Sequence, residues 1–274
     1  MKISIITVCY NAIIGIEKTI QSVLSQSYPE IEYIVIDGGS TDGTVDVIQR
    51  YAEMITYFIS EPDQGIYDAM NKGINVATGD WISFLNAADN YYDNKTIESV
   101  FANKVPFSAD VVYGYTVHVF SYGKFVRKRL PLDSFNSGMP FGHESSFVRS
   151  EIMKRYCFDT SFKIVADYNF FYNLYKKGAI FHFVDVIISE YENMEGASSS
   201  DKNALLIFDE SSRIVGTYNT TTHRKERSRI CLKLKIKRYL SFFSDSFLVS
   251  LQRWKRYHNK QFIPLDTFLM TYNS

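Results

Sequence analysis

The chain has 274 residues, 46% of them hydrophobic, with 30 basic and 30 acidic side chains. This length can hold one large α/β domain with an appendage. The three scattered cysteines include no CxxC pair, and the chain has no run of 18 apolar residues. A disulfide framework, a zinc site and a membrane-spanning helix are therefore not expected.

Apolar strands and amphipathic helices alternate from residue 3 to residue 85. The pattern predicts strands at 3–10, 33–37, 57–60 and 81–85, and helices at 16–26, from a cap at Ser40 or Thr41 to about 53, and at 66–76. Such alternation is typical of a mostly parallel sheet with helices on both faces and right-handed crossovers. The start, MKISIITVCYN, is too short for a signal peptide and is predicted to be a strand.

The pattern is less regular in the second half. Residues 111–119 and 124–130 are predicted to pair as an antiparallel hairpin, and PFGHESSFVR is expected at a loop-to-strand junction. A helix at 167–177, a strand at 181–191, a polar loop at 193–202 and a helix at 205–218 follow. We expect a domain of residues 1–205, divided into 1–93 and 94–205, and a basic helical extension of residues 206–274.

Polar residues follow the predicted parallel strands, at the edge where open α/β sheets bind ligands. Tyr10 and Asn11 end the first strand and Asp37 ends the second. An aromatic ring there can stack on a nucleotide base, and a carboxylate can accept a hydrogen bond from it. The alternative is a core tyrosine and an aspartate that caps the next turn. The loop GGSTDGT is neither a GxGxxG nor a Walker A motif.

The run DQGIYDAMNKG places Asp63, Gly65, Asp68 and Lys72 around a helix start, where backbone N–H groups and a lysine can meet phosphate. Asp68 and Lys72 are also spaced to form an ordinary surface ion pair. Both interpretations stay open for Lys72.

Together with SIITVCYNA and IVIDGGSTDGT, the run EPDQGIYDAMNKGINVATGDWISFLNAAD resembles the N-terminal half of a family 2 glycosyltransferase with the GT-A fold, and a weaker resemblance extends to about residue 200. It implies an inverting, hexosyltransferase-type enzyme whose donor is an NDP-sugar, most simply a UDP-sugar. The residues that it implies in donor and diphosphate binding are Tyr10, Asn11, Asp37, Asp63, Gly65, Asp68, Lys72, Asn86, His143 and Glu144.

The resemblance also raises the question of a metal. Family members have an Asp-x-Asp or related acidic pair after the fourth strand, where this chain has Asn86-Ala87-Ala88-Asp89. Ala88 takes the place of the usual metal-binding aspartate, so Asp89, with Asn86, is left to bind Mg²⁺ or Mn²⁺. The alternative is that Asp89 caps a following helix.

The segment FDTSFKIVADYNFF resembles the family segment that carries the catalytic base, which maps to Asp167. Its apolar neighbours predict burial, which would raise its pKa. The alternative role is a helix N-cap, and Asp159 is the second candidate for the base. His143 and Glu144 are expected on the acceptor side or near the diphosphate, although a lone histidine is often structural.

Twelve lysines and arginines lie between Arg224 and Lys260, against only Glu226 and Asp245, and apolar residues including Trp254 interleave with them. This composition favours an interfacial helix on anionic lipid over nucleic acid; packing on the body or on a second subunit is a third option. We expect a cytoplasmic protein, peripheral on the inner face of the cell membrane. A saccharide or a lipid-diphosphate-linked acceptor in cell-surface polysaccharide or lipopolysaccharide synthesis would fit. A catalytically impaired nucleotide-sugar-binding protein and a nucleotidyltransferase are the alternatives.

Overall fold

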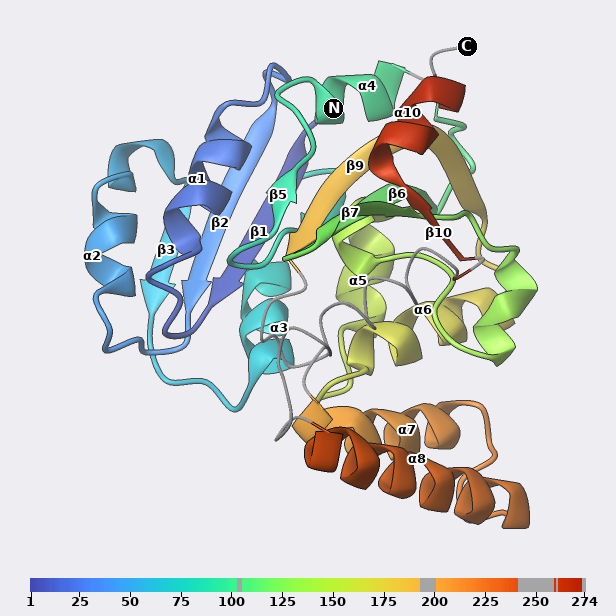
Figure 1. Cartoon of the computed structure of the whole chain (residues 1–274). Helices are drawn as coiled ribbons and strands as arrows, with labels where there is room; N and C mark the ends of the chain where they lie inside the picture. Colours follow the sequence, from blue (N-terminus) through green and yellow to red (C-terminus); the bar gives the residue numbers. More distant parts are fainter. Residues whose placement is uncertain (103–104, 193–200, 241–258, 260, 273–274) are drawn as a thin grey trace.

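The computed structural model of the chain describes residues 1–102, 105–192, 201–240, 259 and 261–272 (Figure 1). Most of the predicted polar loop 193–202 and the end of the basic tail, with Trp254, lie outside these residues.

The first half forms a parallel sheet with the order β4-β1-β2-β3. Its strands are β1 (Ile3–Cys9), β2 (Ile31–Asp37), β3 (Tyr57–Ser60) and β4 (Trp81–Phe84), and its helices are α1 (Ile16–Leu24), α2 (Thr44–Gln49) and α3 (Ile66–Val76). The predicted alternation is confirmed. Strands β1, β2 and β4 are buried along almost their whole length because helices cover both faces of the sheet.

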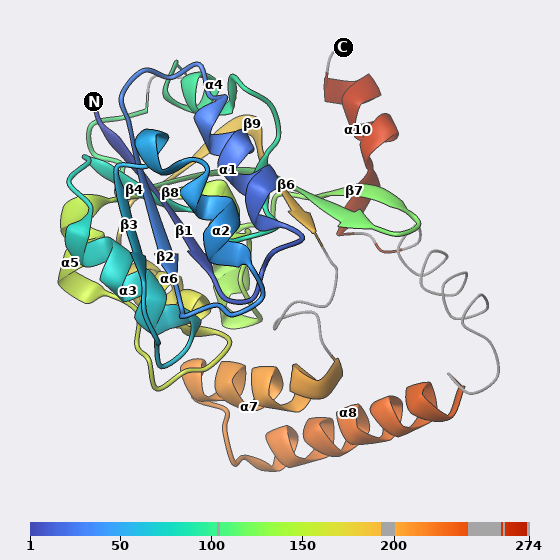
Figure 2. The same ribbon diagram turned by 90° about the vertical axis from the view of Figure 1, so that its left-hand side faces the viewer.

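The second half extends this sheet with mostly antiparallel strands. β8 (Ser146–Arg149) pairs with β4 and with β6 (Val111–Phe120), and β6 forms the predicted hairpin with β7 (Gly123–Arg127). β9 (Phe181–Glu192) runs parallel to β6 and also pairs with β5 (Asn90–Tyr91). β10 (Phe262–Pro264) adds to β7, and α10 (Leu265–Tyr272) follows it at the end of the hairpin (Figure 2).

The pattern did not predict β5, β10, α10, or the helices α4 (Thr96–Ala102) and α5 (Ser150–Tyr156). Both α4 and α5 have only seven residues, too few for a clear helical period. The 3₁₀ turns are η1 (Ala52–Met54), η2 (Leu132–Asn136), η3 (His143–Ser145) and η4 (Asp201–Asn203). The predicted cap of α2 was wrong: α2 begins after Gly43, which has φ of 95°, and Ser40 instead bonds to Asp37.

Two apolar clusters cover the two faces of the sheet. Alternate residues of β1 contribute to each, because successive side chains of a strand point to opposite faces. Ile6 and Val8 pack with Phe84 and Phe171 on the face covered by α3 and α6 (Ala166–Lys176), whereas Ile5 packs with the opposite cluster. The polar ends of the parallel strands are left at one edge.

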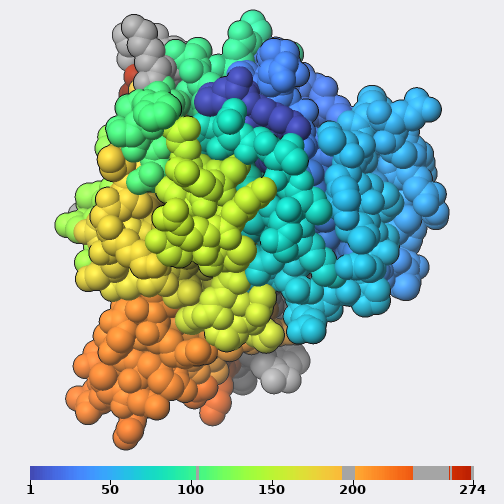
Figure 3. Space-filling view, turned by 180° about the vertical axis from the view of Figure 1, so that it is seen from behind, coloured from blue at the N-terminus to red at the C-terminus, as the bar shows by residue number. Residues whose placement is uncertain are grey.

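The C-terminal extension begins with two paired helices, α7 (Ala204–Ile214) and α8 (Thr221–Leu240), which project below the α6 side of the molecule (Figures 1 and 3). His223 of α8 stacks on Phe208 of α7, and its Nε2 lies 3.0 Å from Oδ1 of Asp209. α7 contacts α6. The domain boundary expected at 205–206 therefore falls inside α7, and the extension packs on the body through that helix.

Candidate active site

The predicted nucleotide side is built around Gly38, just after β2. A Cβ atom at Gly38 would lie 2.4 Å from Oδ2 of Asp63 and 3.4 Å from the ring of Tyr10. The loop after β3 and the end of β1 therefore meet at this glycine. The Tyr10 side chain is 64% exposed, so its alternative role in the core was wrong. An exposed ring beside a carboxylate suits a flat, hydrogen-bonding base.

Asp37 lies buried beneath this surface. Its Oδ2 accepts hydrogen bonds from the backbone N–H groups of Gly39 (3.0 Å) and Ser40 (2.8 Å) and from the Ser60 hydroxyl, and its Oδ1 accepts one from the Ser40 hydroxyl. Burial raises its pKa, but these hydrogen bonds outweigh burial and lower the pKa below the ordinary value. The contacts present are those of the alternative role, in which Asp37 holds the following turn.

Asn11 ties the end of β1 to the same turn. It has φ of 48°, its N–H donates to the Ser40 hydroxyl at 2.7 Å, and its Oδ1 accepts from the N–H of Thr41 at 2.9 Å. Asparagine tolerates this left-handed conformation better than most residues. Asn11 and Asp37 therefore shape the loop under the exposed Tyr10 ring.

The motif around the start of α3 divides into two parts. Gly65, the N-cap, has φ of 122°, and its N–H donates to Oδ1 of Asp63 at 2.8 Å. A glycine is needed there because other residues are strained at such φ. Asp68 accepts from the N–H of Gln64 at 3.1 Å, and Lys72 pairs with Asp68 at 3.8 Å and more closely with Glu61 at 2.8 Å. The surface ion pair is thus the contact that the lysine makes.

Asp167, in the first turn of α6, is held from two sides. Its Oδ1 accepts a hydrogen bond from the hydroxyl of Tyr67 at 2.9 Å, and its Oδ2 lies 3.3 Å from Nδ1 of His143. The Tyr67 hydroxyl also lies 2.6 Å from the carbonyl oxygen of Ile164. The N-cap of α6 is Val165, so the predicted N-cap role of Asp167 was wrong. Asp159 instead bonds the N–H of Ser161, as a turn residue does.

The charges of this group favour an ion pair. Burial would raise the pKa of Asp167, but the hydrogen bond and charge of His143, with the Tyr67 hydroxyl, lower it. The predicted rise was therefore wrong, because the partners outweigh burial. Burial would lower the pKa of His143, but Asp167, with Glu144 and Asp89, raises it to about 9.

Asn86, just after β4, places its Nδ2 atom 3.1 Å from Nε2 of His143, while its own buried Oδ1 has no partner. A neutral imidazole can accept from the Asn86 amide through Nε2. A protonated imidazole donates from both nitrogens, and a half-turn of the amide would then offer Oδ1 as the acceptor. Asn86 is therefore compatible with either protonation state of His143.

Glu144 and Asp89 are buried beside this network. A Cβ atom at Gly142 would lie 2.1 Å from Oε1 of Glu144, so a side chain at this position would force the buried Glu144 carboxylate to move. Burial and the charge of Glu144 raise the pKa of Asp89 well above its ordinary value, and the Asp89 carboxyl accepts a hydrogen bond from the backbone of Glu192. No helix follows Asp89, since residues 90–91 form β5, so its predicted capping role was wrong.

These residues do not fit a divalent cation well. Burial and a raised pKa disfavour the charged carboxylate that Mg²⁺ or Mn²⁺ would need at Asp89. Ala88 offers no side-chain oxygen, and its Cβ lies 2.7 Å from where a Cβ of Gly15 would be. Among the described residues, no three His, Cys, Asp or Glu side chains are grouped to hold one metal ion.

The structure therefore brings the predicted residues together in two groups. Tyr10, Asn11, Asp37 and Asp63 surround Gly38. Asn86, Asp89, His143, Glu144 and Asp167 form the second group. Sequence reasoning missed Tyr67, although it lies inside the motif that was singled out. Its position one turn after Asp63, at the start of a helix, was the available signal.

The sequence model described as "Glycosyl transferase family 2" matches residues 4–180. This chain belongs to that family. The match covers both groups of site residues.

Relatives in the same family come from bacteria. The chain is 35% identical over 176 residues to "Uncharacterized glycosyltransferase Rv1514c" of Mycobacterium tuberculosis, a match that covers 61% of this chain and 66% of that protein. It is 28% identical over 208 residues to the "PGL/p-HBAD biosynthesis glycosyltransferase" of Mycobacterium bovis, covering 72% and 79%. It is 33% identical over 136 residues to the "Putative teichuronic acid biosynthesis glycosyltransferase TuaG" of Bacillus subtilis, covering 48% and 51%.

Solved structures show the same fold. Residues 1–349 of TarS from S. aureus, in complex with UDP-GlcNAc, match with a TM-score of 0.62 at 18% identity, covering 90% of this chain and 74% of that one. The mannosyltransferase PcManGT from Pyrobaculum calidifontis, in complex with GDP-Man and Mn²⁺, matches with a TM-score of 0.62 at 16% identity, covering 85% and 69%. Both are glycosyltransferases of the GT-A fold, and the predicted fold class is confirmed.

Proposed function

We propose that the chain is an inverting glycosyltransferase that moves one sugar from an NDP-sugar, most simply a UDP-sugar, to a saccharide or lipid-linked acceptor. The observation that carries the proposal is the start of α3. Asp63 meets Tyr10 at Gly38, and four residues later Tyr67 bonds Asp167. One short segment thus joins the exposed Tyr10 surface, which suits a nucleotide base, to Asp167, the candidate catalytic base. Transfer of a sugar requires that the nucleotide-binding surface and the catalytic base lie within the length of one nucleotide sugar.

In this proposal Asp167 takes the proton of the acceptor hydroxyl as its oxygen attacks the anomeric carbon. The bond from that carbon to the donor's diphosphate oxygen breaks, and its electron pair leaves with the nucleoside diphosphate. A single displacement inverts the anomeric configuration. The lowered pKa of Asp167 keeps the carboxylate ionised and ready to accept.

Tyr67 supports both protonation states of this base. Its single hydroxyl proton can point to Oδ1 of Asp167 or to the carbonyl oxygen of Ile164, both within 2.9 Å. When Asp167 gains a proton, its own O–H can donate to Tyr67 while Tyr67 donates to Ile164. The network can therefore pass through the proton transfer without leaving a buried donor unpaired.

The donor's diphosphate loses its bond to the sugar and must have its growing charge stabilised. A metal would supply that stabilisation, but Asp89 and Ala88 do not form a site for one, so no step here depends on it. A need for Mg²⁺ or Mn²⁺ stays a prediction. Adding and chelating Mn²⁺ in the assay below tests it.

The extension supports contact with a membrane surface. None of the described helices is long and apolar enough to cross a bilayer. The outer face of α8 instead exposes Leu232 and Ile236 (59% and 50%) among cations. Besides Arg227, which pairs with Asp209, the exposed cations of α8 are Arg224, Lys225, Arg229, Lys233 and Lys235. Lipid anions would attract this face and the two apolar side chains would enter the interface, which fits a lipid-linked acceptor on the cytoplasmic side.

The test is a panel of sugar nucleotides, with and without Mn²⁺, in which release of nucleoside diphosphate and donor binding are both measured. We expect one donor to be turned over by the wild type, and Asp167→Asn to bind that donor but release at least about 100-fold less product. Asp159→Asn, a matched change in a nearby turn, should behave as the wild type. No binding and no release for any donor would refute the proposal.

Two alternatives have distinct outcomes. If a donor binds but no nucleoside diphosphate is released, and Ala88→Asp restores that release, the chain is a catalytically impaired binding protein. Nucleotide exchange with pyrophosphate would identify a nucleotidyltransferase. The family assignment and the paired Asp167 and Tyr67 favour sugar transfer over both.

A further inference from the structure

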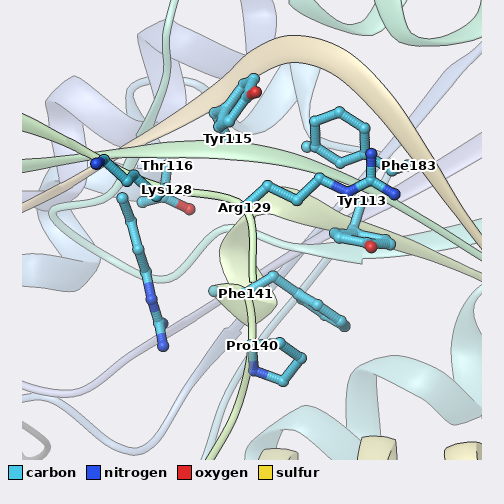
Figure 4. Close-up of a pocket in the computed structure, with 11 residues that line it drawn as sticks. Tyr113, Tyr115, Thr116, Lys128, Arg129, Pro140, Phe141 and Phe183 are labelled. Atoms are coloured by element: carbon cyan, nitrogen blue, oxygen red, sulfur yellow. The ribbon is translucent and has the colours of Figure 1, made fainter. Parts of the chain in front are cut away.

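A shallow hollow lies beside the candidate active site, on the antiparallel part of the sheet (Figure 4). Its walls come from β6, the end of β7 and the residues after it, the segment before η3, and Phe183 of β9. None of the residues predicted as site residues lines it. Its lining includes the aromatic residues Tyr113, Tyr115, Phe141 and Phe183 and, at its rim, the basic residues Arg127, Lys128 and Arg129.

The hollow exists because the pairing between β6 and β9 shifts register. Tyr113 is opposite Phe183, but Tyr115 is opposite Ile187, so β9 carries extra residues between the two pairs. Gly114 allows the close approach that remains, since a Cβ there would lie 2.5 Å from the carbonyl oxygen of Val186. Such irregular pairing is common beside active sites, where it redirects side chains.

The cations at the rim are held in place without being neutralised. The guanidinium of Arg129 lies 4.2 Å from the centre of the Phe183 ring and beside the Tyr113 hydroxyl (Figure 4). Arg127 donates to the carbonyl oxygen of Met139. The ion pairs found among the described residues involve other side chains and leave Arg127, Lys128 and Arg129 without a carboxylate within salt-bridge distance. Fixed arginines of this kind match the oxygens of a phosphate group.

The hollow adjoins the candidate base through a short stretch of chain. Phe141 and Gly142 form part of its wall, and His143, the next residue, lies 3.3 Å from Asp167. Arg127 is close enough to Glu144 for the two charges to interact. An acceptor whose hydroxyl reached Asp167 would therefore extend toward this hollow.

The chemistry of the lining limits what can bind in this hollow. Aromatic walls suit a sugar ring or an apolar stem, and the arginines suit a phosphate. A neutral oligosaccharide would leave Lys128 and Arg129 without an anionic partner.

We propose that this hollow, with Arg127, Lys128 and Arg129 at its rim, binds the phosphate or diphosphate ester group of the acceptor. The inference rests on the proposed transferase function and adds the class of acceptor. Two sources share this chemistry: a lipid-linked diphosphate and a soluble sugar phosphate.

The test measures binding of two probes, geranyl diphosphate and glucose 1-phosphate, to the full chain by calorimetry, with the donor site saturated by the nucleoside diphosphate found in the panel above. Arg129→Gln is the main variant, because Arg129 is exposed and its loss should not prevent folding. Arg155→Gln, an exposed arginine of α5 outside the hollow, is the matched control.

We expect Arg129→Gln to weaken binding of the preferred probe about ten-fold or more, as the loss of a charge-assisted hydrogen bond does, and Arg155→Gln to leave it unchanged. Lys128→Gln should weaken it in the same direction. Tighter binding of geranyl diphosphate would identify the lipid-linked source, and tighter binding of glucose 1-phosphate the soluble one.

Unchanged affinity for both probes in Arg129→Gln and Lys128→Gln, or no binding of either probe to the wild type, would overturn the inference. The nucleotide titration separates this from failure of the proposed function. Arg129→Gln should bind the nucleoside diphosphate as the wild type does, whereas failure of the proposed function would appear in the panel itself, as a wild type that releases no nucleoside diphosphate from any donor.

Discussion

Glu210, on α7 of the C-terminal extension, is predicted to position the catalytic base. Its side chain is almost fully buried, and Oε1 accepts a hydrogen bond from the N–H of Lys163 at 2.7 Å. Oε2 accepts from the N–H groups of Ile164 and Val165 at 3.1 and 3.3 Å. These residues lead directly into α6, and the carbonyl oxygen of Ile164 bonds Tyr67.

The substitution Glu210→Gln keeps the size of the side chain but replaces one accepting oxygen by an NH₂ group. At least one backbone N–H then loses its acceptor and faces another donor. A buried donor without a partner costs about 1–3 kcal/mol, so we expect a loss of roughly 2 kcal/mol in the free energy of unfolding. Because the same segment sets the place of Asp167, and a misplacement of about 1 Å can reduce a rate 100-fold, kcat should fall about 10- to 100-fold.

The assay combines urea unfolding with steady-state kinetics of product release. KM for the donor should change little, because Tyr10 and Asp63 meet at Gly38 and the hydrogen bonds of Glu210 go to residues 163–165. Glu226→Gln on α8, an exposed carboxylate that pairs with Arg229, makes the same chemical change and should alter neither quantity. If Glu210→Gln lowers stability as expected while kcat stays within two-fold of the wild type, Glu210 supports only the fold and the positioning role is refuted.

Three further predictions follow from the site. Tyr67→Phe should lower kcat about ten-fold or more and leave donor affinity unchanged, because Asp167 loses the hydroxyl that serves both of its protonation states; unchanged kcat would contradict this role. Gly15→Ala should destabilise the protein by about 1–3 kcal/mol in thermal unfolding, since the new Cβ would lie 2.7 Å from the Cβ of Ala88 and 2.9 Å from its backbone. A Tm equal to that of the wild type would contradict this, because it would show that the turn after β4 moves to admit the Cβ without a loss of stability. Because the pKa of His143 is raised to about 9 in the folded state, its ion pair with Asp167 should contribute stability fully below the unfolded pKa, near 6.5, and lose it as the pH rises through 9, by up to about 3 kcal/mol. Urea unfolding at pH 6, 8 and 10 should show this loss in the wild type and a smaller one in His143→Gln.

The sequence was enough for the parallel half of the fold because its signals are local. Buried strands and amphipathic helices alternate there, and the strand ends carry Tyr10, Asp37 and Asn86 to one edge. The hairpin of β6 and β7 was also predicted from its alternation and turn. The short helices α4 and α5 were missed because seven residues form too little of a helical period.

The part of the site that the sequence did not predict depends on long-range contacts. Tyr67 and Asp167 are 100 residues apart, and the three N–H groups bonded by Glu210 are about 46 residues from it. No periodicity reports such contacts. The predicted direction of the pKa shift of Asp167 was wrong for the same reason. Apolar neighbours in the sequence indicate burial, but they do not reveal that His143 is the partner of Asp167.

The same contacts imply that the extension has two separable roles. Glu210 on α7 reaches the segment before Asp167, whereas the exposed Lys233 and Lys235 lie more than one turn beyond His223 and Arg227, through which α8 contacts Asp209. Replacing both Lys233 and Lys235 by Gln should therefore weaken binding to vesicles that contain anionic lipid, since each cation near such a surface contributes about 1 kcal/mol. Turnover of a soluble acceptor should stay unchanged. Equal vesicle binding by this double variant and the wild type would refute the membrane role of α8, and a loss of turnover in solution would show that the two roles cannot be separated.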